Sequence, residues 1–264
     1  MKIGVFDSGV GGLTVLSALI KELPSADYIY LGDTARLPYG SKSQATIARY
    51  AVSSARFLVE EGAEFLVIAC NTASALALDA IKEAVRVPVL GVIETGANAA
   101  QASSKTGDVL VIATDATVTS HAYRAASAER GLRAFEKACP LLVPLVEEGW
   151  IEHPVTLDVL QIYLSELLEQ SREAALNPDT LVLGCTHYPL LRTQIERTVP
   201  ALRVIDSAEV TAAQVAAALA TRVHIDSDGV RKFYATDSVD KFKRLGTRFL
   251  GEEIECVGLV DLGG

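Results

Sequence analysis

Short apolar runs alternate along the chain with longer amphipathic stretches. Apolar runs of strand length are typical of buried strands, and stretches with a helical period are typical of helices that cover a sheet. The predicted strands are residues 2–6, 28–31, 65–69, 89–92, 108–113, 180–183, 203–205, 231–235 and 255–257. The predicted helices are residues 44–61, 72–84, 117–130, 155–170, 190–198 and 210–221. Strands separated by helices pair in parallel, so the pattern predicts an α/β fold with mainly parallel sheets flanked by helices.

Two segments in different halves of the chain resemble each other. EFLVIACNTA begins at Glu64, and DTLVLGCTHY begins at Asp179. Each contains an acidic residue, an apolar run, a small residue and a cysteine, followed by a threonine near the start of a helix. Ligands of open α/β sheets bind at the carboxyl ends of the strands. The similarity therefore favours two related domains that face each other across a site.

Composition narrows the classes of function. The 264 residues carry a formal net charge of −9 and are 50% hydrophobic, the balance of a compact protein with a well-filled core. The acidic surface argues against nucleic acid or an anionic membrane as the main partner. No apolar run approaches the ~18 residues of a membrane span, and the start MKIGVFDSG is unlike a signal peptide. We therefore expect a cytoplasmic protein with free thiols, because its four cysteines form no C-x-x-C pair.

A glycine-rich turn follows the first predicted strand. It begins with Asp7 and Ser8 and continues as GVGG, an arrangement suited to binding an anion on exposed backbone N–H groups. It is not a dinucleotide fingerprint, because the third glycine of G-x-G-x-x-G would fall at Thr14. An ordinary tight turn is the simpler alternative. Asp7 and Ser8 favour a ligand site, since they can bind an ammonium and a carboxylate.

Two cysteines, Cys70 and Cys185, lie between the end of a predicted strand and the start of a helix. At Cys70 we expect the helix N-terminus to lower the thiol pKa and favour the thiolate. The alternative is an inert buried thiol. Asn71 and Thr72 can cap that helix or bind a carboxylate. At Cys185 the neighbouring His187 is placed to orient the thiol or stabilise its charge.

Metal sites are not predicted. Cys185 and His187 would make half a zinc site, but no second pair with suitable spacing is present. The stretch DSDG at residues 226–229 lacks the later glutamate of a calcium-binding loop and is predicted to form a turn.

Two thiols at similar strand-to-helix junctions, Cys70 and Cys185, suggest a symmetric reaction. A serine-type hydrolase needs one nucleophile with a histidine base and an orienting acid. Two similar groups instead suit a substrate and product that are mirror images, where one thiolate removes the Cα proton and the opposite thiol returns one. We identify no motif for pyridoxal phosphate, so no cofactor is predicted. The site must then exclude water to make the thiolate a stronger base.

Four motifs resemble the glutamate racemases, a family of cofactor-independent amino-acid racemases. They are DSGVGGLTV at residues 7–15, GDTARLPYG at 32–40, ACNTAS at 69–74 and LGCTHYPLL at 183–191. The resemblance continues in order to about Thr221 and is weak beyond it. It implies interconversion of L- and D-glutamate, which supplies D-glutamate for bacterial peptidoglycan.

The resemblance also implies roles for single residues. Cys70 and Cys185 correspond to the paired acid and base, the first acting on the D-enantiomer and the second on the L-enantiomer. Asp7, Glu147 and His187 correspond to positions with supporting catalytic roles. The positions that hold the substrate are Asp7, Ser8, Tyr39, Gly40, Asn71, Thr72, Thr114, Thr117, Thr186 and His187.

The domain organisation is likewise implied by the family. Residues 1–93 and 207–264 would form one α/β domain and residues 94–206 the second, with the active site in the cleft between them. Homodimers are common in the family, and some members are linked to DNA gyrase. Two alternatives stay open at this point. The chain could be a related two-cysteine racemase that acts on aspartate or another small acid, or a non-catalytic binder of acidic amino acids.

Overall fold

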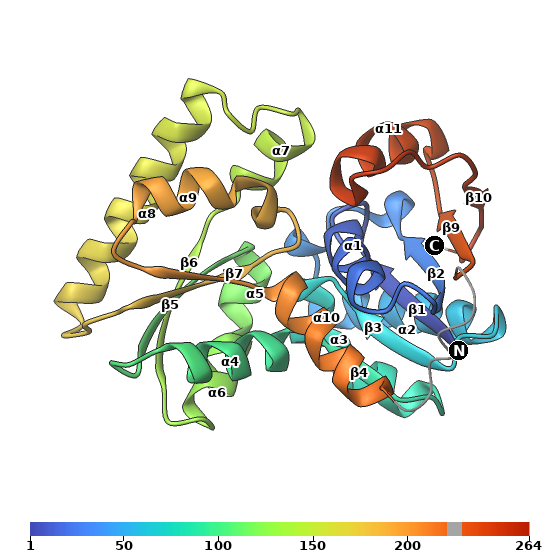
Figure 1. Ribbon diagram of the computed structural model, residues 1–264, viewed down its shortest axis with the longest axis horizontal. Helices are drawn as coiled ribbons and strands as arrows, with labels where there is room; N and C mark the ends of the chain where they lie inside the picture. The colour runs from blue at the N-terminus through green and yellow to red at the C-terminus, as the bar shows by residue number, and fades with distance from the viewer. Residues whose placement is uncertain (221–228, 264) are drawn as a thin grey trace.

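A computed structural model describes residues 1–220 and 229–263, whose strands form two parallel sheets (Figure 1). The first sheet contains, in spatial order, β10 (Gly258–Leu259), β9 (Arg231–Ala235), β2 (Asp27–Gly32), β1 (Lys2–Asp7), β3 (Phe65–Ile68) and β4 (Val89–Gly91). The second contains β6 (Arg133–Ala138), β5 (Asp108–Ala113), β7 (Thr180–Gly184) and β8 (Arg203–Asp206). Neighbouring strands in both sheets pair in parallel. The predicted α/β class is confirmed.

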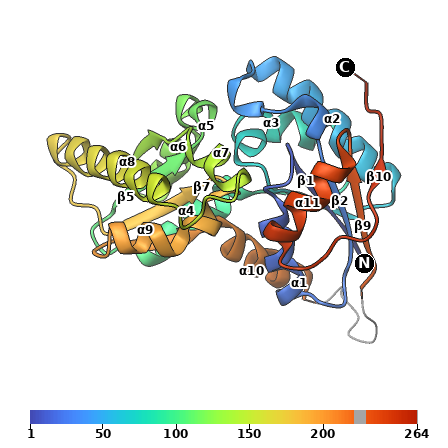
Figure 2. The same cartoon turned by 90° about the horizontal axis from the view of Figure 1, so that it is seen from above.

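Helices cover both sheets (Figure 2). They are α1 (Leu13–Glu22), α2 (Gln44–Glu60), α3 (Asn71–Ala84), α4 (Val92–Ser103), α5 (Asp115–Ser120), α6 (Ala122–Ala128), α7 (Leu142–Glu147), α8 (Pro154–Glu173), α9 (Arg192–Thr198), α10 (Ser207–Leu219) and α11 (Val239–Leu250). Helix α10 packs against both α1 and α4 and so joins the two halves. Among the described helices, none combines the length and apolar character that crossing a bilayer requires.

The central strands are apolar along most of their length because both of their faces are buried. Every residue of β3, β5 and β7 is buried. One cluster of buried side chains extends from Leu16 in the first half to Leu110 and Leu183 in the second. The strands that carry the candidate residues in the two halves are therefore packed on one continuous hydrophobic core.

The chain returns to the first sheet after completing the second. Strand β9 pairs with β2, and β10 pairs with β9 at the edge. The expected domain division places one boundary between β8 and α10 and the other inside α4, after residue 93. That division stays a prediction.

Some sequence predictions were wrong in detail. The strand predicted at residues 255–257 is absent, and β10 forms just after it. Strand β6 was not predicted, because its sequence RAFEKA contains three charged residues and lies at a sheet edge. The helix predicted at 117–130 is two helices, since His121 has a left-handed backbone with φ of 54°. Residue 221 of the helix predicted at 210–221, and residues 226–228 of the predicted turn, lie outside the described residues.

Candidate active site

A cavity of about 540 Å³ lies at the carboxyl ends of strands from both sheets. Eleven of the predicted site residues line it: Ser8, Tyr39, Gly40, Cys70, Asn71, Thr72, Thr114, Glu147, Cys185, Thr186 and His187. The two remaining ones, Asp7 and Thr117, are buried and are not among the lining residues. Both cysteines therefore face one cavity, with each sheet contributing one thiol.

Cys70 is the N-cap residue of α3. Its thiol donates to Ser8 Oγ at 3.5 Å, and its sulfur accepts from the backbone N–H of Ala73 at 3.4 Å. Burial and the nearby Asp7 charge raise the thiol pKa to about 12, although these hydrogen bonds lower it. The expectation that the helix N-terminus would give Cys70 a low pKa was therefore wrong, because desolvation of a thiolate outweighs one N–H donor here.

Cys185 follows β7 and precedes a short 3₁₀ turn, Tyr188–Leu191, that leads into α9. Its sulfur lies 3.9 Å from Nδ1 of His187. The other ring nitrogen of His187, Nε2, lies 3.3 Å from Oε1 of Glu147. The three side chains thus form a continuous relay from the thiol to a carboxylate.

This relay sets the charge of His187, beside the second thiol. Burial lowers the pKa of His187, but its hydrogen bonds to Cys185 and Glu147 raise it to about 10. The hydrogen bond with His187 lowers the pKa of Glu147 below its ordinary value, against the effect of burial. His187 is therefore a cation at neutral pH, held between a thiol and a carboxylate.

Asp7 lies behind Cys70 at the end of β1. Its Oδ2 accepts from the backbone N–H of Gly9 at 2.9 Å, whereas its buried Oδ1 has no hydrogen-bond partner. Burial raises the pKa of Asp7, although the nearby His187 lowers it. An unpaired buried oxygen is costly, which agrees with the raised pKa of this carboxyl group.

The glycine-rich turn brings the two halves of the site into contact. A Cβ at Gly11 would lie 2.3 Å from Oγ1 of Thr186 and 2.5 Å from the His187 ring. Thr14 Oγ1 also donates to the backbone oxygen of Thr186 at 3.0 Å. Glycine is thus required at residue 11 for close packing, a purpose that the sequence pattern alone did not distinguish from anion binding.

Asn71 presents a free donor to the cavity. Its Oδ1 accepts from Tyr123 at 2.7 Å, which fixes the orientation of the amide. Its Nδ2 is buried without a partner. This N–H₂ group can therefore donate to a carboxylate in the cavity.

Three threonine hydroxyls join α3 to the start of α5. Thr72 Oγ1 lies 3.0 Å from that of Thr114 and 3.3 Å from that of Thr117, and the last two are 2.9 Å apart. Thr117 thus supports two lining residues from behind. Because hydroxyls both donate and accept, this cluster can turn its protons towards an anion.

The loop with Tyr39 and Gly40 is held by residues that sequence reasoning did not assign to the site. The Tyr39 hydroxyl donates to the fully buried Asp33. The other oxygen of Asp33 accepts from Arg36 at 2.8 Å and from Thr236 at 2.9 Å. The GDTARLPYG motif contains Asp33 and Arg36. Their role in holding the loop depends on the contact of Asp33 with Thr236, which follows β9 and is distant in sequence.

Further lining residues were also not predicted. They are Leu37, Pro38, Ser41, Asp115, Pro140, Val143, Pro144 and Lys241. Leu37 and Pro38 lie inside the GDTARLPYG motif, and Val143 and Pro144 lie close in sequence to the predicted Glu147, so nearness to predicted residues was a usable signal. Lys241 comes from α11, an amphipathic helix that was not predicted although its apolar residues recur with a helical period.

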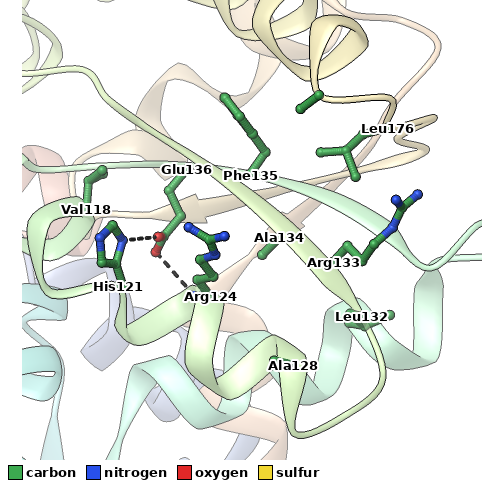
Figure 3. A pocket seen from close by; sticks show the side chains of 11 residues that line it. Val118, His121, Arg124, Ala128, Leu132, Arg133, Ala134, Phe135, Glu136 and Leu176 are labelled. Atoms are coloured by element: carbon green, nitrogen blue, oxygen red, sulfur yellow. Dashed lines mark hydrogen bonds and ion pairs between the residues drawn. The ribbon is translucent and has the colours of Figure 1, made fainter.

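Other hollows lack this chemistry. One of about 660 Å³ lies between α2 and the C-terminal segment and is lined by Arg49, Arg56 and their neighbours. Another, of about 450 Å³, lies beside the edge strand β6 (Figure 3). There Glu136 lies between His121, whose Nδ1 is 3.2 Å away, and the backbone N–H of Arg124. Neither hollow is lined by a cysteine, so chemistry rather than volume identifies the candidate site.

In residues 1–220 and 229–263, no cluster of three His, Cys, Asp or Glu side chains is arranged to hold a metal ion. The four cysteines are unpaired, with Cys70, Cys139 and Cys185 buried and Cys256 exposed.

Comparison with known proteins gives the family. A profile of the Asp/Glu/hydantoin racemases matches residues 3–215. The glutamate racemase of Koribacter versatilis is 50% identical over 99% of this chain and 98% of its own length. A glutamate racemase isoform of Bacillus anthracis has a crystal structure with a TM-score of 0.92 at 37% identity, covering 98% of this chain and 97% of its own. The crystal structure of the Francisella tularensis glutamate racemase, in complex with D-glutamate, has a TM-score of 0.90 at 36% identity and covers 99% of this chain and 97% of its own. This chain therefore belongs to the Asp/Glu/hydantoin racemase family.

Proposed function

We propose that the chain is a glutamate racemase, which interconverts L- and D-glutamate and supplies the D-enantiomer for peptidoglycan synthesis. The observation that carries the proposal is that Cys70 and Cys185, from two similar strand–helix corners, line one cavity. A two-base reaction at Cα requires such a pair, because the proton leaves from one face and returns to the other. The relatives named above support glutamate as the substrate.

In the D-to-L direction, the Cys70 thiolate removes the Cα proton and becomes a thiol. The electron pair left on Cα is delocalised into the substrate carboxylate. The Cys185 thiol then donates its proton to the opposite face and becomes a thiolate, charge-stabilised by His187. The L-to-D direction reverses these steps, so the two thiols must start in opposite protonation states.

Burial makes the base strong enough for this task. A thiol whose pKa is about 12 gives a more basic thiolate than an exposed cysteine does. The substrate ammonium would compensate for the charge of that thiolate, beside the Ser8 hydroxyl at 3.5 Å from the sulfur and close enough to the buried Asp7 for its charge to act on the thiol. Water exclusion strengthens both interactions.

The polar lining would hold the two carboxylates of the substrate. Asn71 Nδ2 is an unpaired donor, and Thr72, Thr114 and Thr186 line the same cavity as Asn71. Tyr39 and Gly40 belong to the loop that follows β2 and form another part of the cavity wall. These donors can stabilise the negative charge that develops on the α-carboxylate in the transition state.

Proton exchange in D₂O tests the proposal. The protein is incubated with L-glutamate, D-glutamate or L-aspartate, and loss of the Cα proton signal is followed by NMR alongside optical rotation. We expect exchange and racemisation with both glutamate enantiomers, and loss of racemisation in Cys70→Ala and Cys185→Ala. Cys139→Ala is the matched control, because this cysteine is buried but does not line the cavity.

Two outcomes would replace the proposal. Faster exchange with aspartate than with glutamate would assign the other substrate. No exchange with any acid, together with unchanged glutamate affinity in both cysteine variants, would indicate a binding protein. The expected homodimer and cytoplasmic location remain predictions. Sedimentation of the protein over a concentration series by analytical ultracentrifugation tests whether it forms a homodimer.

A further inference from the structure

Helix α11 joins the first sheet's half of the molecule to the second half. It packs on α1 through buried Phe242, Leu245 and Phe249. Arg248 reaches from it to α7, where its Nη1 donates to the backbone oxygens of Val146 at 3.2 Å and Glu147 at 3.3 Å. Figure 1 shows α11 facing α7 across the gap between the two halves.

The chain after α7 is shaped around this guanidinium. Gly149 has a φ of 81°, a conformation that other residues rarely adopt. A Cβ there would lie 2.7 Å from Nη2 of Arg248 and 2.9 Å from its Cζ. Gly149 is thus required by the left-handed turn, and the Arg248 guanidinium fills the space beside it.

Two other residues of α11 contact the relay directly. Lys241 Nζ lies 3.5 Å from Oε2 of Glu147, whose other oxygen faces His187. The ring of Phe249 meets the His187 ring edge-on, with centroids 5.0 Å apart. Residues seven and eight apart share one face of a helix, so a single face of α11 contacts the backbone and carboxylate of Glu147 and the ring of His187.

We propose that Arg248 and Lys241 are positioning residues that hold Glu147 against His187, so that α11 controls proton transfer at Cys185 and not at Cys70. This inference rests on the proposed racemase function. Lys241 is about half exposed, so its ion pair contributes little to stability. Its effect is on orientation, to which proton transfer is sensitive at the scale of 1 Å.

Variants of α11 test the inference. We expect Arg248→Met to lower kcat about tenfold with KM nearly unchanged, a loss comparable to one misdirected charge-assisted hydrogen bond. Lys241→Met should have a smaller effect in the same direction, and Arg248→Lys should recover part of the rate. The matched control is Arg244→Met, since Arg244 is exposed on the same helix and its side chain has no hydrogen bond or ion pair within the described residues.

Isotope effects show which thiol is affected. Because L- and D-glutamate are mirror images, their equilibrium constant is one, and kcat/KM must fall equally in both directions in every variant. By the proposed mechanism, the α-deuteron of L-glutamate leaves at Cys185 and that of D-glutamate at Cys70. Slower transfer at Cys185 should therefore raise the isotope effect on kcat/KM with α-deuterated L-glutamate and reduce it with the D-enantiomer.

The outcomes separate the two proposals. Wild-type protein without racemase activity would refute the proposed function. An active wild type in which Arg248→Met and Lys241→Met behave like Arg244→Met, or change both isotope effects alike, would refute only the role of α11. Lys241→Met keeps the test decisive if Arg248→Met fails to fold, because Lys241 lies at the surface.

Discussion

Replacing Glu147 by Gln would remove a charge from the relay while keeping its shape. Glu147 accepts the contact from His187 Nε2 at 3.3 Å and lies 3.5 Å from Lys241 Nζ. Gln still offers an oxygen to His187 but no negative charge. The variant therefore isolates the electrostatic part of the relay from its geometry.

The magnitude follows from the kind of hydrogen bond that is lost. Bonds to charged groups contribute about 1.5–3 kcal/mol and neutral ones about 0.5–1.5 kcal/mol. The difference of about 1–1.5 kcal/mol corresponds to roughly a tenfold fall in kcat/KM. A bare Coulomb energy at this separation would be larger, about 5 kcal/mol at an effective dielectric of 20. We use the smaller figure because Asp7 and Cys185 also stabilise the His187 cation and remain in place.

The pH dependence has a definite sign. Glu147 is one of the groups that raise the pKa of His187 to about 10, so the variant lowers that pKa. His187 then loses its proton at a lower pH, and the alkaline limb of kcat/KM moves down the pH scale. The folding stability provided by the raised pKa is complete below the ordinary value near 6.5 and is lost as pH rises through about 10. The variant should lose part of this stability at neutral pH.

The assay follows optical rotation of L-glutamate between pH 6 and 10.5, with unfolding by urea measured beside it. Glu148→Gln is the matched control, because Glu148 is the exposed neighbour and does not line the cavity. A variant with an unmoved alkaline limb and a rate within twofold of wild type would show that the Glu147 charge does not act through His187.

Three further predictions concern the first thiol and the walls of the cavity. Asn71→Ala should raise KM for glutamate about tenfold or more, because the free Nδ2 donor is lost; unchanged KM would exclude Asn71 from binding. Gly11→Ala should cost about a hundredfold in kcat/KM, since the added Cβ pushes against Thr186 and His187; a fully active variant would contradict the observed packing. Urea unfolding should show stability falling between pH 9 and 12, because the unfolded thiol of Cys70 ionises while the buried one, with a pKa of about 12, does not. Cys70→Ala should weaken that fall by up to about 1.4 kcal/mol per pH unit, and an identical slope in both proteins would refute the assignment.

The sequence determined the class of fold because parallel strands buried on both faces must be largely apolar. The runs at β3, β5 and β7 were recognisable for this reason, whereas the edge strand β6 was not. It also located both candidate thiols, since a polar residue directly after a buried strand falls at the edge where ligands bind. These are local properties, which a window of a few residues records.

Only the tertiary structure decided the properties that depend on distant parts of the chain. The pKa of Cys70 is raised by burial against segments far from it, which outweighs the local helix N-terminus that the sequence displays. Tyr39 is anchored through Asp33 to Thr236, and Glu147 is contacted by Lys241 and Arg248 of α11. Desolvation and contacts across the chain depend on what surrounds a group in space, and the order of residues along one segment does not contain that information.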